Sequence, residues 1–180
     1  SEAQGSAHGA RLEAMTWKLP IIFYCENNGM AIHSEISEMH PTEDISSLAQ
    51  GYGIPAMVID GQDVFACAEA ALAGIERARR GEGPTFIEAK TLRIKEHDMG
   101  TPDLKGWEAR SEEEILALKE RDPLLLATKR VLAESVLSQA EIDQLHDEAS
   151  QEVQEIEDFA DSSNIARPSE EQLLAAVFAP

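Results

Sequence analysis

The stretch Pro20-Ile21-Ile22-Phe23-Tyr24-Cys25, followed by Glu26-Asn27-Asn28-Gly29, decides how this chain folds. Six apolar or aromatic residues that end in side-chain amides and a glycine predict a buried strand opening into a turn. Ligands of open α/β sheets bind at the carboxyl ends of the strands, so these amides are well placed to bind one. An asparagine there offers a neutral carbonyl oxygen, which suits Mg²⁺ shared with a phosphate-bearing cofactor.

Further strands and helices continue this pattern along the chain. Residues 56–59 and 84–89 are short apolar runs typical of buried strands, and helices are expected over 45–50 and after Asp63, which would cap the second. A helix is also expected over residues 2–17. The order of strands and helices predicts an α/β fold with a parallel sheet flanked by helices.

The second half of the chain is predicted to be helical. Periodicity fails over residues 91–110, which read as an extended loop that holds His97. Beyond it, Ser111 with Glu114 and Ser138 with Glu141 have the spacing of capping boxes. We therefore expect an α/β domain over residues 1–110 and a C-terminal helical extension over 111–180.

The composition excludes some classes of partner. The chain has 180 residues, with 15 Lys and Arg against 34 Asp and Glu, and a formal charge of −19, so nucleic acid and anionic membranes would be repelled. No apolar stretch is long enough to span a bilayer. Cys25 and Cys67 lie in apolar surroundings without CxxC spacing, which indicates reduced thiols in a cytosolic environment, and Cys25 reads as an inert buried thiol rather than a nucleophile.

Four segments carry a resemblance to a known family: WKLPIIFYCENNG (17–29), GYGIP (51–55), IDGQD (59–63) and GPTFIE (83–88). The chain resembles the alpha subunits of thiamine-diphosphate-dependent 2-oxo acid dehydrogenases, which include the first components of the pyruvate and branched-chain complexes and acetoin dehydrogenase. The similarity runs in one register across essentially the whole chain. It implies the thiamine-diphosphate-binding fold.

The resemblance assigns the metal site. The cofactor motif of this family begins with Gly-Asp-Gly and ends in Asn-Asn, so Asn28 corresponds to the side-chain ligand of Mg²⁺ and Met30 to the residue whose main-chain carbonyl binds it. By spacing, Gly-Asp-Gly would fall immediately before Ser1. We therefore expect the chain to represent the later half of an alpha subunit, with the fold incomplete at the N-terminus and the backbone amide of Ser1 beside the diphosphate.

The resemblance also assigns a loop histidine. Family members carry a Tyr-Arg-x-x-Gly-His pattern after the strand that corresponds to 84–89, and this chain keeps Arg93 and His97 while Leu92 and Glu96 replace the tyrosine and the glycine. His97 is implied to be catalytic, orienting the substrate and stabilising charge by hydrogen bonding, and Arg93 and His97 are implied to contact the cofactor.

The activity implied is oxidative decarboxylation of pyruvate or a related 2-oxo acid, with thiamine diphosphate and Mg²⁺ as cofactors and acyl transfer to a lipoyl-bearing acyltransferase. A beta subunit would complete an α2β2 heterotetramer in the cytoplasm, or in an organelle matrix in a eukaryote. Pyruvate, branched-chain acids and acetoin all remain open, with pyruvate or acetoin favoured. Two alternatives remain: a non-catalytic fragment or split-subunit interaction module, and a plain α/β domain whose Asn-Asn is only a turn.

A first prediction concerns the isolated chain. Without the aspartate of Gly-Asp-Gly, a divalent cation at Asn28 and Met30 lacks the carboxylate that would help to neutralise and fix it. The 180 residues alone should therefore bind thiamine diphosphate weakly or not at all, and should be inactive. Isothermal calorimetry with Mg²⁺ present checks this, and tight magnesium-dependent binding would contradict it.

Overall fold

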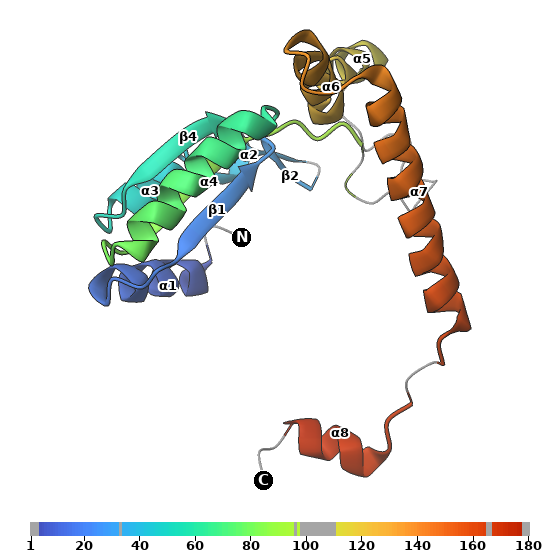
Figure 1. Cartoon of the computed structure of the whole chain (residues 1–180). Helices are drawn as coiled ribbons and strands as arrows, with labels where there is room; N and C mark the ends of the chain where they lie inside the picture. Colours follow the sequence, from blue (N-terminus) through green and yellow to red (C-terminus); the bar gives the residue numbers. More distant parts are fainter. Residues whose placement is uncertain (1–3, 33, 96, 98–110, 165–166, 178–180) are drawn as a thin grey trace. The chain divides into compact units, whose positions relative to one another are not determined.

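The computed structural model describes residues 4–32, 34–95, 97, 111–164 and 167–177 (Figure 1). The chain divides into two units, Ser1–Val131 and Leu132–Pro180. The predicted boundary between residues 110 and 111 borders residues outside the described ranges and stays a prediction.

A parallel sheet of three strands lies at the centre of the first unit. Its order is β1-β5-β4, with β1 over Ile22–Asn27, β5 over Thr85–Lys90 and β4 over Ala56–Asp60. The central strand β5 is buried from Thr85 to Ala89, as a strand covered on both faces must be. These strands confirm the predicted α/β fold with a parallel sheet.

Helices cover both faces of the sheet (Figure 1). On one face, α4 (Val64–Arg79) approaches so closely at Gly74 that an added Cβ would lie 3.1 Å from Ile22 Cδ1. The Asp63 side chain accepts hydrogen bonds from the Phe65 and Ala66 main-chain N–H groups, which confirms the predicted cap. On the other face, α3 (Ser46–Gln50) helps to enclose a core of Cys25, Ile45, Ala49, Ile54 and Phe86.

The N-terminal helix α1 (Gly5–Thr16) contributes a buried cation to this core. The Arg11 side chain is 1% exposed, and its guanidinium carbon lies 5.3 Å from the centre of the Phe86 ring. Burial lowers the pKa of Arg11 from its ordinary value. The helix was predicted from the sequence, but its buried arginine was not.

Two local features differ from the prediction. The strand β1 continues through Asn27, two residues beyond the predicted end, because Asn27 pairs with Lys90 and its carbonyl accepts a hydrogen bond from Thr91 N–H. The segment after Gly29 also contains a small antiparallel hairpin of β2 (Met30–Ala31) and β3 (Ser34–Glu35), followed by α2 (Ile36–Met39).

In the described residues after the sheet, the helices are α5 (Glu112–Lys119), α6 (Pro123–Ala133), α7 (Gln139–Ser162) and α8 (Glu170–Val177). Both predicted capping boxes are confirmed, with Ser111 and Glu114 at α5 and Ser138 and Glu141 at α7. Of the described helices, none combines the length and the apolar composition needed to cross a bilayer.

The turn between β4 and α4 generates a prediction about stability. A Cβ added at Gly61 would lie 2.5 Å from Thr91 Cγ2 and 3.0 Å from the Lys90 carbonyl oxygen, so Gly61→Ala should lower the free energy of unfolding by about 1–3 kcal/mol. A Cβ added at Gly9 in α1 meets nothing within 4 Å. Gly9→Ala is therefore the matched control, and should raise stability by up to about 1 kcal/mol through helix propensity. Urea unfolding followed by circular dichroism checks both, and a Gly61→Ala chain as stable as the parent would contradict the packing described.

Candidate functional site

A tight turn lies at the carboxyl end of β1, where the sequence predicts a ligand site. Asn27 Oδ1 accepts a hydrogen bond from Gly29 N–H at 3.0 Å, and Asn28 Oδ1 accepts one from Met30 N–H at 3.0 Å. Gly29 has a φ of +74°, a left-handed conformation that a glycine adopts without strain. The Gly29 carbonyl in turn accepts a hydrogen bond from Ile36 N–H at 2.8 Å, which ties the turn to the end of the hairpin.

Asn28 and Met30 lie on the wall of a pocket of about 440 Å³. The pocket is bounded by β1, by the turn and by the segment that leads to α3. Its lining residues are Tyr24, Cys25, Glu26, Asn27, Asn28, Met30, Ala31, Ile36, Met39, His40 and Ile45. Asn28 is half-buried and belongs to the lining of this pocket rather than to the core.

A second pocket, of about 270 Å³, brings Arg93 to the same turn. Asn28, Met30 and Arg93 all contribute to its wall. The Arg93 Nη1 donates a hydrogen bond to the Ile32 carbonyl at 2.5 Å, which holds the guanidinium beside the hairpin. Three residues that the resemblance assigns to the cofactor thus lie together, although they are far apart in the sequence.

The other two assigned residues are not placed at this turn. His97 is exposed, four positions beyond Arg93 along the chain. Ser1 lies outside the described residues. The roles of all five residues stay predictions.

The chemistry of the turn fits a magnesium ion. The Asn28 side chain and the Met30 main chain each offer a carbonyl oxygen, the hard ligand type that Mg²⁺ prefers. A carbonyl oxygen has two lone pairs, so Asn28 Oδ1 can accept the Met30 N–H and still bind a cation. Among the described residues, no group of three or more His, Cys, Asp and Glu side chains is placed to hold a metal, so the other ligands of an ion at Asn28 and Met30 would have to come from elsewhere.

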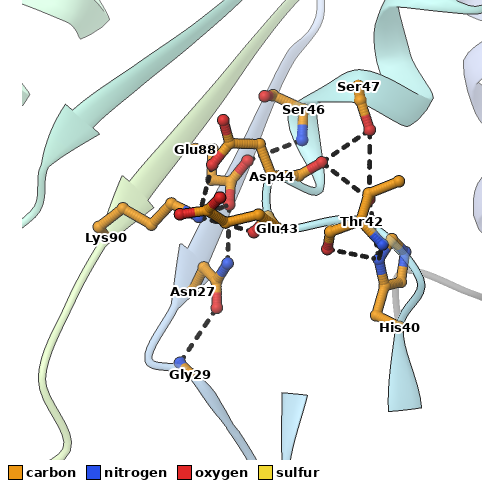
Figure 2. Close-up of polar contacts among 10 residues, drawn as sticks. All are labelled: Asn27, Gly29, His40, Thr42, Glu43, Asp44, Ser46, Ser47, Glu88 and Lys90. Carbon is orange, nitrogen blue, oxygen red and sulfur yellow. Dashed lines mark hydrogen bonds and ion pairs between the residues drawn. The ribbon is translucent and has the colours of Figure 1, made fainter. Parts of the chain in front are cut away.

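A buried carboxylate lies behind the turn (Figure 2). Glu88, on β5, is 0% exposed. Its Oε1 accepts hydrogen bonds from Asn27 Nδ2 at 2.7 Å and from Lys90 Nζ at 2.8 Å, and its Oε2 accepts one from Ser46 N–H at 2.7 Å. The Lys90 ammonium also contacts Asp44 Oδ1 at 2.8 Å.

These contacts decide the charge of Glu88. Burial raises the pKa of the Glu88 carboxyl, but hydrogen bonds from Lys90, Asn27 and the Ser46 and Ile45 main-chain N–H groups outweigh it, so the pKa lies below its ordinary value. Burial lowers the pKa of the Lys90 ammonium, but its contacts with Asp44 and Glu88 raise it by more, so the pKa lies above its ordinary value. The pair is therefore ionised at neutral pH.

The sequence reasoning did not single out Glu88 or Lys90. The signal was present, because a carboxylate in the middle of the apolar run Pro84-Thr85-Phe86-Ile87 and Ala89 must be paired if that run is a buried strand. Its partners could not be named, since Asn27 and Ser46 are brought to it only by the sheet and by α3.

The buried position predicted for Cys25 is confirmed, and its inert character stays a prediction. The side chain is 7% exposed and belongs to the core on the α3 face. Burial and the nearby Glu88 charge raise the pKa of the Cys25 thiol, which disfavours the nucleophilic thiolate.

The chain is similar to known proteins over most of its length. The family described as "Dehydrogenase E1 component" matches residues 1–169. The chain is 35% identical over 173 residues to the pyruvate dehydrogenase E1 component subunit alpha of Zymomonas mobilis, covering 96% of this chain and 47% of that protein. It is 38% identical over 169 residues to the 2-oxoisovalerate dehydrogenase subunit alpha of Bacillus subtilis, covering 93% and 50%. The chain thus spans about half the length of the curated relatives it matches.

The buried pair generates a prediction about pH. Because the folded pKa of Glu88 lies below its ordinary value of 4.5, the stability from its ionised form is fully present above pH 4.5 and is lost as pH falls through the folded pKa. Glu88→Gln should lower the free energy of unfolding by about 3 kcal/mol at pH 7, since Lys90 loses its buried partner.

The difference between the parent and Glu88→Gln should then shrink below pH 4.5, measured by urea unfolding at several pH values. Glu152→Gln, on the exposed part of α7, is the control and should shift stability by less than about 0.5 kcal/mol. A difference between Glu88→Gln and the parent that persists unchanged into acid would contradict the assigned role of the charge.

Proposed function

We propose, because the chain belongs to the dehydrogenase E1 component family, that it forms part of the alpha subunit of a thiamine-diphosphate-dependent 2-oxo acid dehydrogenase. The reaction would be oxidative decarboxylation of pyruvate or a related 2-oxo acid, followed by acyl transfer to a lipoyl group. The names of the relatives include both pyruvate dehydrogenase and 2-oxoisovalerate dehydrogenase. The family therefore supports the class of reaction but does not choose among the 2-oxo acid substrates.

The observation that carries the proposal is the turn after β1. Asn28 and Met30 line one pocket at the carboxyl end of a parallel strand, where α/β sheets bind their ligands, and this supports the proposal. Asn28 Oδ1 and the Met30 carbonyl oxygen would hold Mg²⁺, and the cation would hold the diphosphate of the cofactor.

Thiamine diphosphate, when bound, supplies the carbanion chemistry of the decarboxylation. The residues of this chain would bind the cofactor, orient the substrate and balance the negative charge of the diphosphate. Arg93 lines the second, smaller pocket together with Asn28 and Met30, and its guanidinium offers the positive charge that an anionic diphosphate needs. His97, which is exposed and follows Arg93 by four positions, would orient the substrate carboxylate and stabilise developing charge by donating a hydrogen bond.

The partners follow from the same assignment. A beta subunit in an α2β2 heterotetramer would complete the active site, and a lipoyl-bearing acyltransferase would receive the acyl group. The formal charge of −19 agrees with a basic face on a protein partner and disfavours nucleic acid.

The test is reconstitution. The chain is produced with a beta subunit and with a segment that corresponds to the half of the alpha relatives it does not cover. Three reactions are assayed by reduction of an artificial electron acceptor: decarboxylation of pyruvate, decarboxylation of a branched-chain 2-oxo acid, and cleavage of acetoin. We expect activity with one of them, loss of that activity in Asn28→Ala, and a decrease of about 100-fold in His97→Ala.

Two variants on α7 serve as matched controls. Gln144→Ala removes an exposed carboxamide, and His146→Ala removes an exposed imidazole, both outside the first unit. Each should stay within about twofold of the parent complex. Full activity in Asn28→Ala would contradict the metal assignment. Absence of activity in every combination would favour the non-catalytic interaction module instead.

A further inference from the structure

We infer that the buried carboxylate of Glu88 positions the metal-binding turn by fixing the side chain of Asn27. Asn27 and Glu88 are then positioning residues, which act on the cation through Asn28 and Met30 without touching it. This inference rests on the proposed function, because that function assigns metal binding to the turn. The inference itself concerns Asn27 and Glu88, which the resemblance does not assign.

The first step runs from the carboxylate to the amide. An ionised carboxylate only accepts hydrogen bonds, and Glu88 Oε1 lies 2.7 Å from Asn27 Nδ2. The amide cannot turn over, because its oxygen would then face the carboxylate oxygen. Glu88 therefore decides which end of the Asn27 amide points toward the turn.

The second step runs from the amide to the turn. Because Glu88 holds Asn27 Nδ2, Asn27 Oδ1 is directed at Gly29 and accepts a hydrogen bond from its N–H at 3.0 Å. Figure 2 shows this path from Glu88 through Asn27 to Gly29. Fixing Gly29 fixes the peptide groups on either side of it, and these carry Asn28 and Met30.

The anchor itself is rigid. Glu88 is fully buried and Asn27 is 6% exposed, so water does not compete for their hydrogen bonds. Ser46 N–H and Lys90 Nζ also donate to the carboxylate, at 2.7 Å and 2.8 Å. The turn is thus fastened to the central strand of the sheet, and a ligand oxygen placed in advance binds a cation more tightly than one that must be ordered.

A purely structural role for Glu88 makes a different prediction. If the carboxylate only neutralises Lys90 and caps the start of α3, then changes at Asn27 should affect global stability and leave the turn no looser than the rest of the sheet. The two roles are separated by a variant that keeps the contact to Gly29 and breaks the contact to Glu88.

Asn27→Asp is that variant. An aspartate oxygen can still accept the Gly29 N–H, while the other oxygen lacks the N–H that Asn27 donates to Glu88 and, when ionised, repels Glu88 Oε1. Both readouts are therefore taken at about pH 8 and above, where a proton shared between the two carboxyls is disfavoured. In the reconstituted complex at saturating thiamine diphosphate, the apparent dissociation constant for Mg²⁺, measured by calorimetry, should rise about 10- to 100-fold. This direction is diagnostic, because an added negative charge near a cation would otherwise tighten its binding.

A second readout needs no cofactor. In the 180-residue chain, amide hydrogen exchange at Met30 and Ile36 should become at least about tenfold faster in Asn27→Asp, while exchange at Phe86 and Ile87 on β5 stays unchanged. Asp44→Asn, at the half-exposed end of the same network, contacts Lys90 and not the turn, so it is the matched control and should alter neither readout. Glu88→Leu, which adds no charge and leaves Asn27 and its contact to Gly29 in place, is read in the same way if Asn27→Asp does not fold.

Unchanged Mg²⁺ affinity together with unchanged exchange at Met30 and Ile36 would overturn the inference. So would exchange that rises equally at Phe86 and Ile87, since that result indicates general destabilisation. Failure of the proposed function gives a different pattern: Mg²⁺ affinity is then insensitive to Asn28→Ala, while the exchange readout of Asn27→Asp still responds.

Discussion

The ionised carboxylate of Glu88, fully enclosed in the sheet, is the constraint around which the candidate site is built. A buried charge is tolerated only when it is paired and its acceptor positions are filled, and here the partners come from β1, from β5 itself and from the start of α3. Satisfying one carboxylate therefore fixes three segments relative to one another. The turn that follows β1 and the segment that leads to α3 adjoin two of them, and both line the larger pocket.

Parallel register explains why distant residues meet at this edge. Asn27 lies opposite Lys90, so β1 and β5 end at the same level of the sheet. The chain leaves β1 through Asn28 and Met30, and it leaves β5 toward Arg93 and His97. Arg93 consequently lies beside Asn28 and Met30, although more than sixty positions separate them in the sequence. The carbonyl oxygens of this turn and the guanidinium beside them would suit the magnesium-bound diphosphate that we propose.

Local signals predicted most of the fold correctly. The cap at Asp63 and the capping boxes at Ser111 and Ser138 depend on contacts within three residues, so the sequence contains them completely. The end of β1 was misjudged because Asn27 looks like a turn residue until Glu88, sixty-one positions away, binds it inside the sheet. The hairpin at 30–35 was missed, since strands of two residues have no readable period. Asn28, Met30, Arg93 and His97 were assigned by resemblance, and only the first three are brought together by the described structure.

The most direct test of this account is a crystal structure of the reconstituted complex grown with Mn²⁺ in place of Mg²⁺ and with thiamine diphosphate, since anomalous scattering locates the metal without ambiguity. The account predicts a manganese peak about 2.1 Å from both Asn28 Oδ1 and the Met30 carbonyl oxygen, with Asn27 Nδ2 still bonded to Glu88. A metal bound to other groups, or an Asn28 side chain turned away from the occupied pocket, would contradict it.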